Sequence, residues 1–317
     1  MTDALRTASL LDAYEKALVE LGERDSQLVV FEADQSGPNR TAPFGVRFPD
    51  RFFHLGVMGS TMMAIAAGVA LGGRTVYASG DAVFSAGQAY NVVRQSVSYH
   101  RANVKVVGTH AGLLAGGDGG MHQMVEDIGL MRGLPGMTVV VPADAPTARS
   151  VTFAVAERAG PAYLRLAQGS LPVVTDGTFA LGRAGELRSG TDLTIVAIGS
   201  LVARALEVAE ELARVGISTR VLDFASVKPF DEPALLRAAR DTGAVLVAEE
   251  HSVATGVGAL VAATTAENYP VPVRRVGVPD VFGESGDPGT LLDRYGMSKE
   301  RILDEAWELL KSRGKVS

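Results

Sequence analysis

The chain has 317 residues, of which 47% are hydrophobic and 21% are charged, and its formal net charge at pH 7 is −6. This length and composition fit two globular domains of ordinary size, each with a core of its own. The acidic balance argues against a nucleic-acid or acidic-membrane partner, because no surplus of basic residues is present to neutralise phosphates. The absence of cysteine excludes disulfides, thiolate metal sites and cysteine nucleophiles.

The sequence carries no recognisable targeting or membrane signal. The N-terminal residues, MTDALRTASL, lack a basic region followed by an apolar core, so we expect no signal peptide. No stretch approaches the roughly 18 uninterrupted apolar residues of a membrane-spanning helix. We therefore expect a cytoplasmic protein.

The first half of the chain alternates short apolar runs with amphipathic stretches, which predicts an α/β fold with a mostly parallel sheet. Ser9 followed by Asp12 resembles a capping box and predicts the start of the first helix, whose apolar face includes Tyr14 and Leu18. Asp144 is predicted to cap a later helix. The predicted strands are 27–34, 52–57, 75–79, 103–109, 137–141 and 162–166, and the other predicted helices are 60–71, 85–99 and 122–132.

A second α/β unit follows a segment rich in glycine, threonine and serine, which we interpret as the interdomain connection. The predicted boundaries are a first domain at 1–172, a linker at 173–191 and a second domain at 192–317. Gly216 is the expected C-terminal cap of the first helix of the second domain. The predicted strands of this domain are 192–200, 219–226, 244–250 and 273–278, and its last helix lies near 297–312.

Polar residues follow the ends of several predicted strands of the first domain. Asp81 follows strand 75–79, His110 follows strand 103–109, and Asp118 and His122 end the glycine-rich loop that comes next. Ligands of open α/β sheets bind at the carboxyl ends of the strands, and histidine titrates near neutral pH, so this group could perform acid–base chemistry. Residue types alone favour equally the alternative that His122 caps its helix and Asp118 is a turn residue.

Other motifs are weaker. The run GGDGG lacks the lysine and the serine or threonine of a phosphate-binding loop. The run VFSAG resembles a hydrolase nucleophile elbow, but Val83 stands where the first glycine belongs, so Ser85 is predicted to be a helix N-cap.

Two further features have open or structural readings. For His251, in EEHS, a surface or interface role and a chemical role both stay open. Met62 and Met63 are predicted to pack in the core.

Five stretches, taken in order, resemble the C-terminal half of transketolase: RFFHLGV…MMAIAAGVAL, NVKVVGTHAG, GDGGMHQMVEDIGLMRGLPGMTVVVPAD, VAEEHSVATGVGALVA and VPDVFGESGDPGTLLDRYGMS. More closely, they resemble the separate C-terminal subunit of split transketolases, over nearly all of the chain. Pyruvate dehydrogenase E1 β subunits and deoxyxylulose phosphate synthases share the architecture, but the pattern of His110, Asp118 and His122 is closer to transketolase. The resemblance implies a pyrimidine-binding domain followed by a transketolase C-terminal domain.

The resemblance also implies thiamine diphosphate, which in this family lies between two subunits or domains. The family holds the diphosphate and Mg²⁺ with a GDG…N motif, and the GDG at 117–119 has no asparagine at the expected distance. A partner N-terminal subunit is therefore implied to supply the metal ligands, in an α2β2 assembly.

On this chain, the same likeness implies that the aminopyrimidine ring lies against Met58, Gly59, Asp81 and Phe84. His110, Asp118 and His122 would then point at the hydroxyls and carbonyl of the substrate, which they position and with which they exchange protons.

Two departures from the family concern the ring. The family motif has glutamate at the position of Gly59, where it bonds N1′ of the aminopyrimidine, and an aromatic residue at the position of Asp81. Our hypothesis is that Asp81 takes over the contact with the ring, directly or through water. The alternative is that Asp81 is a solvated turn residue, and that the enzyme works without the relay or does not work.

A third departure concerns the substrate. Leu11 and Gln168 stand at the two positions where transketolases carry arginines for the sugar phosphate, and Arg165 lies three residues earlier, within a strand. An aliphatic chain and a neutral amide cannot make charge-assisted contacts with phosphate. The sequence therefore predicts a donor or acceptor without a terminal phosphate.

These observations favour a subunit of a split transketolase-like enzyme that transfers a two-carbon ketol or acyl unit. A non-catalytic regulatory or scaffolding subunit of the same fold is an alternative, favoured by the loss of the glutamate. A third interpretation is an E1 β-like subunit of a 2-oxo acid decarboxylase, which would require a lipoyl-domain acceptor. An unrelated α/β hydrolase is remote, because VFSAG fails the motif.

Overall fold

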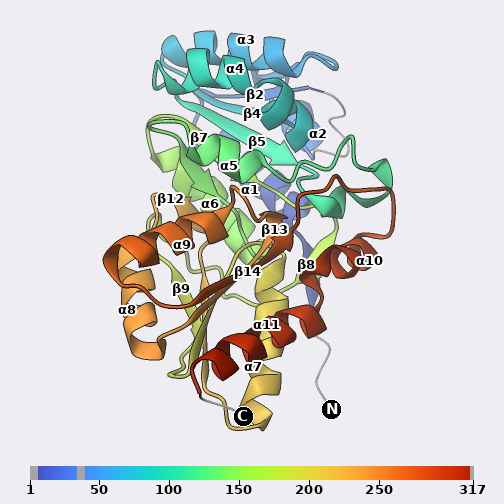
Figure 1. Ribbon diagram of the computed structural model, residues 1–317. Coiled ribbons are helices and arrows are strands. Elements are labelled where there is room, and N and C mark those ends of the chain that lie inside the picture. The colour runs from blue at the N-terminus through green and yellow to red at the C-terminus, as the bar shows by residue number, and fades with distance from the viewer. Residues whose placement is uncertain (1–5, 34–39, 315–317) are drawn as a thin grey trace.

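Two α/β units are stacked along the chain in the computed structural model, which describes residues 6–33 and 40–314. Figure 1 shows the N-terminal unit, coloured blue to green, above the C-terminal unit, coloured yellow to red. The predicted α/β class is thereby confirmed. Within the described ranges, no helix combines the length and the apolar character that a membrane span requires.

The first unit is built on a seven-stranded sheet with the order β12-β6-β7-β5-β4-β2-β3. All neighbours pair in parallel except β12, which is antiparallel to β6. A parallel sheet covered on both faces is expected for strands that are almost wholly apolar. The strands are β2 (Leu28–Glu32), β3 (Phe52–His54), β4 (Thr75–Asp81), β5 (Val104–Thr109), β6 (Thr138–Val140), β7 (Ala162–Arg165) and β12 (Ser226–Lys228).

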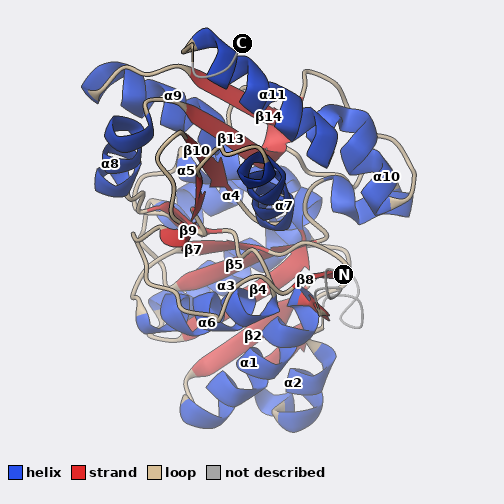
Figure 2. Cartoon of the chain, turned by 90° about the horizontal axis from the view of Figure 1, so that it is seen from below, coloured by secondary structure: helices blue, strands red, loops and turns tan. Residues whose placement is uncertain are grey.

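Helices cover both faces of this sheet, as Figure 2 shows. α1 (Leu10–Arg24) and α6 (Ala145–Glu157) pack on one face, and α3 (Gly59–Leu71) with the helical stretch 83–98 packs on the other. That stretch consists of π-helical turns at Val83–Gln88 and Val93–Ser98 around the short α4 (Tyr90–Val92). The remaining helices are α2 (Ala42–Arg47) and α5 (Asp127–Arg132), with 3₁₀ turns at Pro49–Arg51 and Leu113–Asp118.

Local signals at the helix ends are mostly confirmed. The Ser9 hydroxyl accepts from the Asp12 amide at 3.1 Å, and Asp144 accepts from the Thr147 amide at 3.1 Å. Gly216 follows the end of its helix with φ +84°, a conformation that glycine adopts readily. Met62 and Met63 are fully buried, as predicted.

Two local predictions are wrong. Ser85 is not a helix N-cap, because the helical turn already begins at Val83 and the Ser85 hydroxyl donates back to the Gly80 carbonyl at 3.3 Å. The helix predicted from residue 122 starts only at Asp127, because residues 122–126 have irregular backbone, with Gln123 donating to the Glu284 carbonyl of the second unit.

The second unit has a five-stranded sheet with the order β14-β13-β10-β11-β9. Its strands are β9 (Gly185–Arg188), β10 (Leu193–Ala197), β11 (Thr219–Asp223), β13 (Val245–Ser252) and β14 (Val273–Val278). Its helices are α7 (Leu201–Arg214), α8 (Glu232–Thr242), α9 (Val257–Asn268), α10 (Pro288–Leu292) and α11 (Lys299–Ser312), with a π turn at Asp293–Met297.

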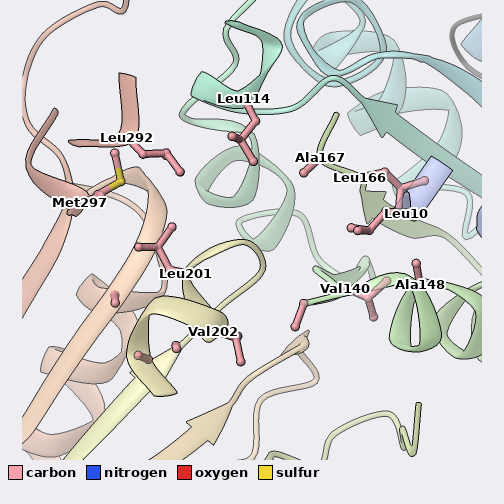
Figure 3. Packing of buried hydrophobic residues seen from close by; sticks show 14 of the residues in the cluster. Leu10, Leu114, Val140, Ala148, Leu166, Ala167, Leu201, Val202, Leu292 and Met297 are labelled. Atoms are coloured by element: carbon pink, nitrogen blue, oxygen red, sulfur yellow. The ribbon is translucent and has the colours of Figure 1, made fainter. Parts of the chain in front are cut away.

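The two units share backbone pairing as well as a core. β12 comes from the second half of the chain but joins the first sheet, and β9, from the predicted linker, pairs antiparallel with β11 in the second sheet. β8 (Ser170–Pro172) pairs antiparallel with β1 (Thr7–Ser9). Figure 3 shows the apolar cluster that both halves build, with Leu201 and Leu292 on one side and Leu10 and Leu166 on the other. This packing fixes the carboxyl edge of the first sheet against the second unit.

Candidate active site

The ends of β4 and β5 bring together an acid and a histidine. The parallel register places Asp81 beside Thr109, and His110 follows directly. Oδ1 of Asp81 lies 2.8 Å from Nδ1 of His110 and accepts a hydrogen bond from the Thr109 hydroxyl at 3.0 Å. Both side chains are largely buried, with 13% of Asp81 and 8% of His110 exposed. The structure therefore joins two of the four predicted catalytic residues into a pair.

The neighbours of His110 determine which ring nitrogen carries the proton. Nδ1 faces the Asp81 carboxylate and, at 3.1 Å, the Thr109 oxygen, whose own hydrogen is donated to the carboxylate. Both neighbours of Nδ1 therefore act as acceptors, so Nδ1 carries the proton. In the neutral ring Nε2 then has no hydrogen and can accept a proton. This is the tautomer that general-base catalysis through Nε2 requires.

The backbone at His110 is held in a costly conformation. Its φ is +50°, and a non-glycine residue in the left-handed region costs about 1–3 kcal/mol. The next amide, that of Ala111, donates to the Leu166 carbonyl at 3.3 Å. The turn is thus fixed by its attachment to the residue that follows β7, and it directs His110 toward Asp81.

The other two predicted catalytic residues lie farther along the loop. His122 packs edge-on against Phe84, with ring centroids 5.8 Å apart, and its Nδ1 lies 3.2 Å from the Asp118 carbonyl oxygen. The alternative that His122 caps a helix is wrong, because Glu126 holds the N-cap position of α5. The Asp118 side chain is exposed and lines a cleft of about 850 Å³ between the two units.

Gly59 begins α3 at a point where the helix approaches the turn that carries Phe84. A Cβ atom on Gly59 would lie 3.0 Å from the Phe84 carbonyl oxygen and 3.4 Å from the Phe84 Cβ. Backbone atoms cannot move aside as a flexible side chain can, so glycine allows this approach. Met58, immediately before the helix, is 52% exposed. Met58, Gly59, Phe84 and Asp81 thus lie around one edge of the sheet.

Placing a glutamate at Gly59, as the family resemblance implies, is expected to destabilise the chain. Gly59→Glu should lower the free energy of unfolding by about 1–3 kcal/mol, because overpacking against the Phe84 backbone forces a local shift. Urea denaturation followed by circular dichroism measures this. Gly68→Glu is the matched control, because it adds the same side chain to α3 where a Cβ meets nothing within 4 Å. Equal losses in both variants would show that the Phe84 contact is not the cause.

Leu11, Gln168 and Arg165, the positions considered above for phosphate recognition, are occupied by internal contacts. Leu11 is buried in the core, and the Gln168 amide, assigned with its nitrogen toward the Leu114 and Ala115 carbonyls, donates to them at 3.1 and 3.3 Å. Arg165 is only 3% exposed, and its Nε donates to the Asp127 carboxylate at 2.9 Å. None of the three side chains offers a free guanidinium to a phosphate.

His251, the second-last residue of β13, is not on the surface. It is fully buried between the units, where its Nε2 accepts from the Gly129 amide at 3.2 Å. Burial lowers the pKa of His251 to about 4, so the ring is neutral at physiological pH. The side chain therefore forms part of the interface between the units.

A buried ionic cluster at this interface was missed by the sequence analysis. Asp127 accepts from Arg165 and from the Tyr163 hydroxyl at 2.7 Å, and Glu250 lies on the other side of Arg165. The available signal was the pair of consecutive acids at the end of the apolar strand β13. The partner Arg165 lies more than 80 residues away in the sequence, so no local pattern could identify it.

Comparison with known proteins gives the family. Residues 6–173 match the transketolase pyrimidine-binding domain and residues 182–302 match the transketolase C-terminal domain. The chain is 39% identical to one subunit of the 6-deoxy-6-sulfo-D-fructose transketolase of a Clostridium species, over 96% of this chain and 95% of the relative. It is 35% identical to one subunit of the apulose-4-phosphate transketolase of Phocaeicola vulgatus, over 94% and 96% of the two chains.

A solved structure agrees with these relatives. It is described as a split gene transketolase, inactive beta4 tetramer, and it superposes with a TM-score of 0.89 at 44% identity, over 96% of this chain and 98% of that chain. The expected domain pair and the expected kind of relative are both confirmed. The chain belongs to the transketolase family and consists of its pyrimidine-binding and C-terminal domains, as do the C-terminal subunits of split transketolases.

Proposed function

We propose that this chain is the C-terminal subunit of a split, thiamine diphosphate-dependent transketolase-like enzyme that transfers a two-carbon ketol or acyl unit. The observation that carries the proposal is the Asp81–His110 pair at the carboxyl edge of the pyrimidine-binding domain, with Phe84, three residues after Asp81, packed against His122. The test is a transfer assay on the chain together with a diphosphate-binding subunit, thiamine diphosphate and Mg²⁺.

The residues present fit the ring end of the cofactor but not its charged end. Met58 and Phe84 offer apolar surface for an aromatic ring, and Oδ2 of Asp81 makes no hydrogen bond to any residue that the structure describes. Conversely, residues 6–33 and 40–314 contain no group of three or more His, Asp or Glu that could hold a metal ion. We therefore assign the diphosphate and Mg²⁺ to a partner subunit.

The chain's own residues divide the chemistry between them. Thiamine diphosphate would supply the nucleophilic carbon for breaking and forming the carbon–carbon bond. Asp81 holds the His110 ring through Oδ1, and its Oδ2 would be the group available to the aminopyrimidine. Nε2 of His110 accepts a proton from a substrate hydroxyl, and Asp118 and His122 orient the remaining hydroxyls.

Exposed apolar residues near the site support a partner subunit. Met121, in the loop that carries Asp118 and His122, is 88% exposed, and Phe282 is 85% exposed. The two segments are close, because a Cβ on Gly120 would collide with the Gly283 carbonyl oxygen. Large exposed apolar side chains are typical of interfaces with other proteins. We propose an α2β2 heterotetramer, and the solved relative, described as an inactive beta4 tetramer, supports a need for the other subunit.

The substrate is proposed to lack a terminal phosphate. The two relatives are named for a sulfonated sugar and a sugar phosphate, whereas here Leu11 and Gln168 are neutral and Arg165 is paired with Asp127. A buried guanidinium that already has a carboxylate partner gives no net attraction to a second anion. Neutral polyhydroxylated donors or acceptors fit this site best.

Gln168→Arg is expected to shift the ratio of kcat/KM toward phosphorylated acceptors by about tenfold or more, because a bidentate, charge-assisted contact becomes possible. Paired assays with a sugar and its phosphate measure this shift. Gln168→Met is the matched control, since it removes the amide hydrogen bonds to Leu114 and Ala115 without adding charge. A wild-type enzyme that prefers the phosphorylated acceptor would overturn the substrate proposal.

Gly59 favours a second candidate function, a non-catalytic regulatory or scaffolding role in the complex, since no side chain at this position can bond the aminopyrimidine. This candidate predicts a complex that binds its partner and has no transfer activity. The E1 β-like alternative predicts that 2-oxo acid turnover depends on a lipoyl domain as the acceptor, so adding that domain to the same assay distinguishes it.

A further inference from the structure

One carboxylate of the second unit is hydrogen-bonded to the catalytic loop. Glu250, near the end of β13, accepts a hydrogen bond from the Leu114 amide to Oε1 at 2.8 Å, and Oε2 accepts from the Ser200 hydroxyl at 2.8 Å. Leu114 lies in the loop that connects His110 to Asp118 and His122. The contact therefore joins the C-terminal domain to the segment that carries three of the four predicted catalytic residues.

Glu250 is kept in place by charge as well as by hydrogen bonds. The Arg165 guanidinium lies 3.8 Å from Oε2, its Nη2 donates to the Glu250 carbonyl at 2.9 Å, and Asp127 holds its other side. Burial raises the pKa of Glu250, and Arg165 opposes this shift. Because donors face both carboxylate oxygens, the ionised form is the one that these contacts stabilise.

The loop is shaped to approach this carboxylate. Gly112 has φ +79°, and a Cβ there would collide with Oε1 of Glu250 and lie 2.5 Å from Nη2 of Arg165. Only glycine allows the backbone to pass so close to the pair at a positive φ. Glycine at position 112 is therefore what allows the loop backbone to lie this close to Glu250 and Arg165.

Packing and polar contacts together hold the loop. α10 packs against residues 113–118, and Leu114 and Ala115 are buried although they border the cleft of about 850 Å³ between the units. The polar contacts come from Glu250, from Gln168, from the Gly286 amide, which donates to the Gly116 carbonyl at 3.4 Å, and from Gln123, whose amide donates to the same carbonyl at 3.2 Å. Glu250 is the charged group among them.

We propose that Glu250 is a positioning residue of the active site, which sets the conformation of the loop at 112–122 and thereby the places of Asp118 and His122. The kinetic consequence rests on the proposed function, but the hold on the loop does not. The C-terminal domain would then contribute to catalysis by holding the substrate-binding loop of the first domain in position.

The test is Glu250→Gln in the full chain, measured alone and in the complex with its partner. Amide hydrogen exchange at Leu114 and its neighbours should become about tenfold faster or more, because a charge-assisted acceptor is weakened. In the complex, kcat/KM should fall by about 10–100-fold, and KM should rise. A smaller folded fraction would lower kcat and leave KM unchanged, so the KM distinguishes positioning from a loss of folded protein.

Glu249→Gln is the matched control. Glu249 is the adjacent residue and equally buried, but its carboxylate accepts from the Val257 and Gly258 amides at the start of α9, at 2.7 and 2.8 Å. The same chemical change there should speed exchange at those two amides and leave the loop and KM unchanged. Glu250→Ala would remove one of the two carboxylates that balance the buried Arg165 charge, and it risks unfolding the chain. The test therefore uses the glutamine variant.

The outcomes are separable from those of the proposed function. Unchanged exchange at Leu114 in Glu250→Gln overturns the inference, whatever the activity. Faster exchange with unchanged KM and kcat also overturns it, because the loop would then be held without a catalytic consequence. A wild-type complex without transfer activity would refute the proposed function, and the exchange measurement would still decide whether Glu250 holds the loop.

Discussion

Asp81→Asn is expected to lower the kcat/KM of the complete enzyme by about 10²–10⁴-fold while leaving the fold intact. The carboxylate faces Nδ1 of His110 at 2.8 Å and accepts from Thr109. An asparagine can turn its NH₂ group toward Nδ1, which then becomes the acceptor and places the ring proton on Nε2. The histidine would be present but in the wrong tautomer to accept a proton from the substrate.

A double-variant cycle shows whether Asp81 acts through His110. If it does, Asp81→Asn combined with His110→Ala should be no slower than the slower single variant, because both remove one unit. Circular dichroism and affinity for the partner subunit control for folding and assembly. An unchanged rate in Asp81→Asn would discard the proposed role. Additive losses would instead place Asp81 at the aminopyrimidine ring, independently of His110.

The purified chain is expected to show no transfer activity by itself, and activity is expected to appear when the diphosphate-binding subunit, thiamine diphosphate and Mg²⁺ are all added. The physical reason is the charge of the cofactor: the diphosphate and its metal require oxygen ligands that the described part of this chain does not group together. Product formation from a two-carbon donor, followed by chromatography, measures the effect.

Omission of each component is the control for this second prediction. Removing Mg²⁺ with a chelator should abolish turnover and leave the fold of this chain unchanged, because none of its described residues is predicted to bind the metal. Turnover by the chain with thiamine diphosphate but without another subunit would contradict the proposal that it supplies only half of the site.

The two positions at which the sequence is expected to depart from the family have a common structural setting. Phe84, three residues after Asp81, brings its carbonyl oxygen close to Gly59 and its ring against His122. Both expected departures thus lie near one residue. This arrangement is why the two departures are best tested together.

The positions of the candidate catalytic residues along the chain follow from the sequence, but the contact between Asp81 and His110 does not. Asp81 and His110 each follow an apolar strand, and the carboxyl edge of a parallel sheet collects such residues. Their 2.8 Å contact, however, depends on β4 and β5 being neighbours in a particular register. The register follows from packing of the whole sheet, so spacing in the sequence did not reveal it.

The sequence by itself determined the α/β class, the helix caps at Ser9 and Asp144 and the two-domain family, because periodicity, capping and motifs are local. Tertiary structure alone decided that β12 joins the first sheet, that α5 starts at Asp127 and that Glu250 contacts Leu114. Each of these depends on groups far apart in the chain. Such contacts form only when burial of both domains against each other fixes their relative position, and no local pattern encodes that position.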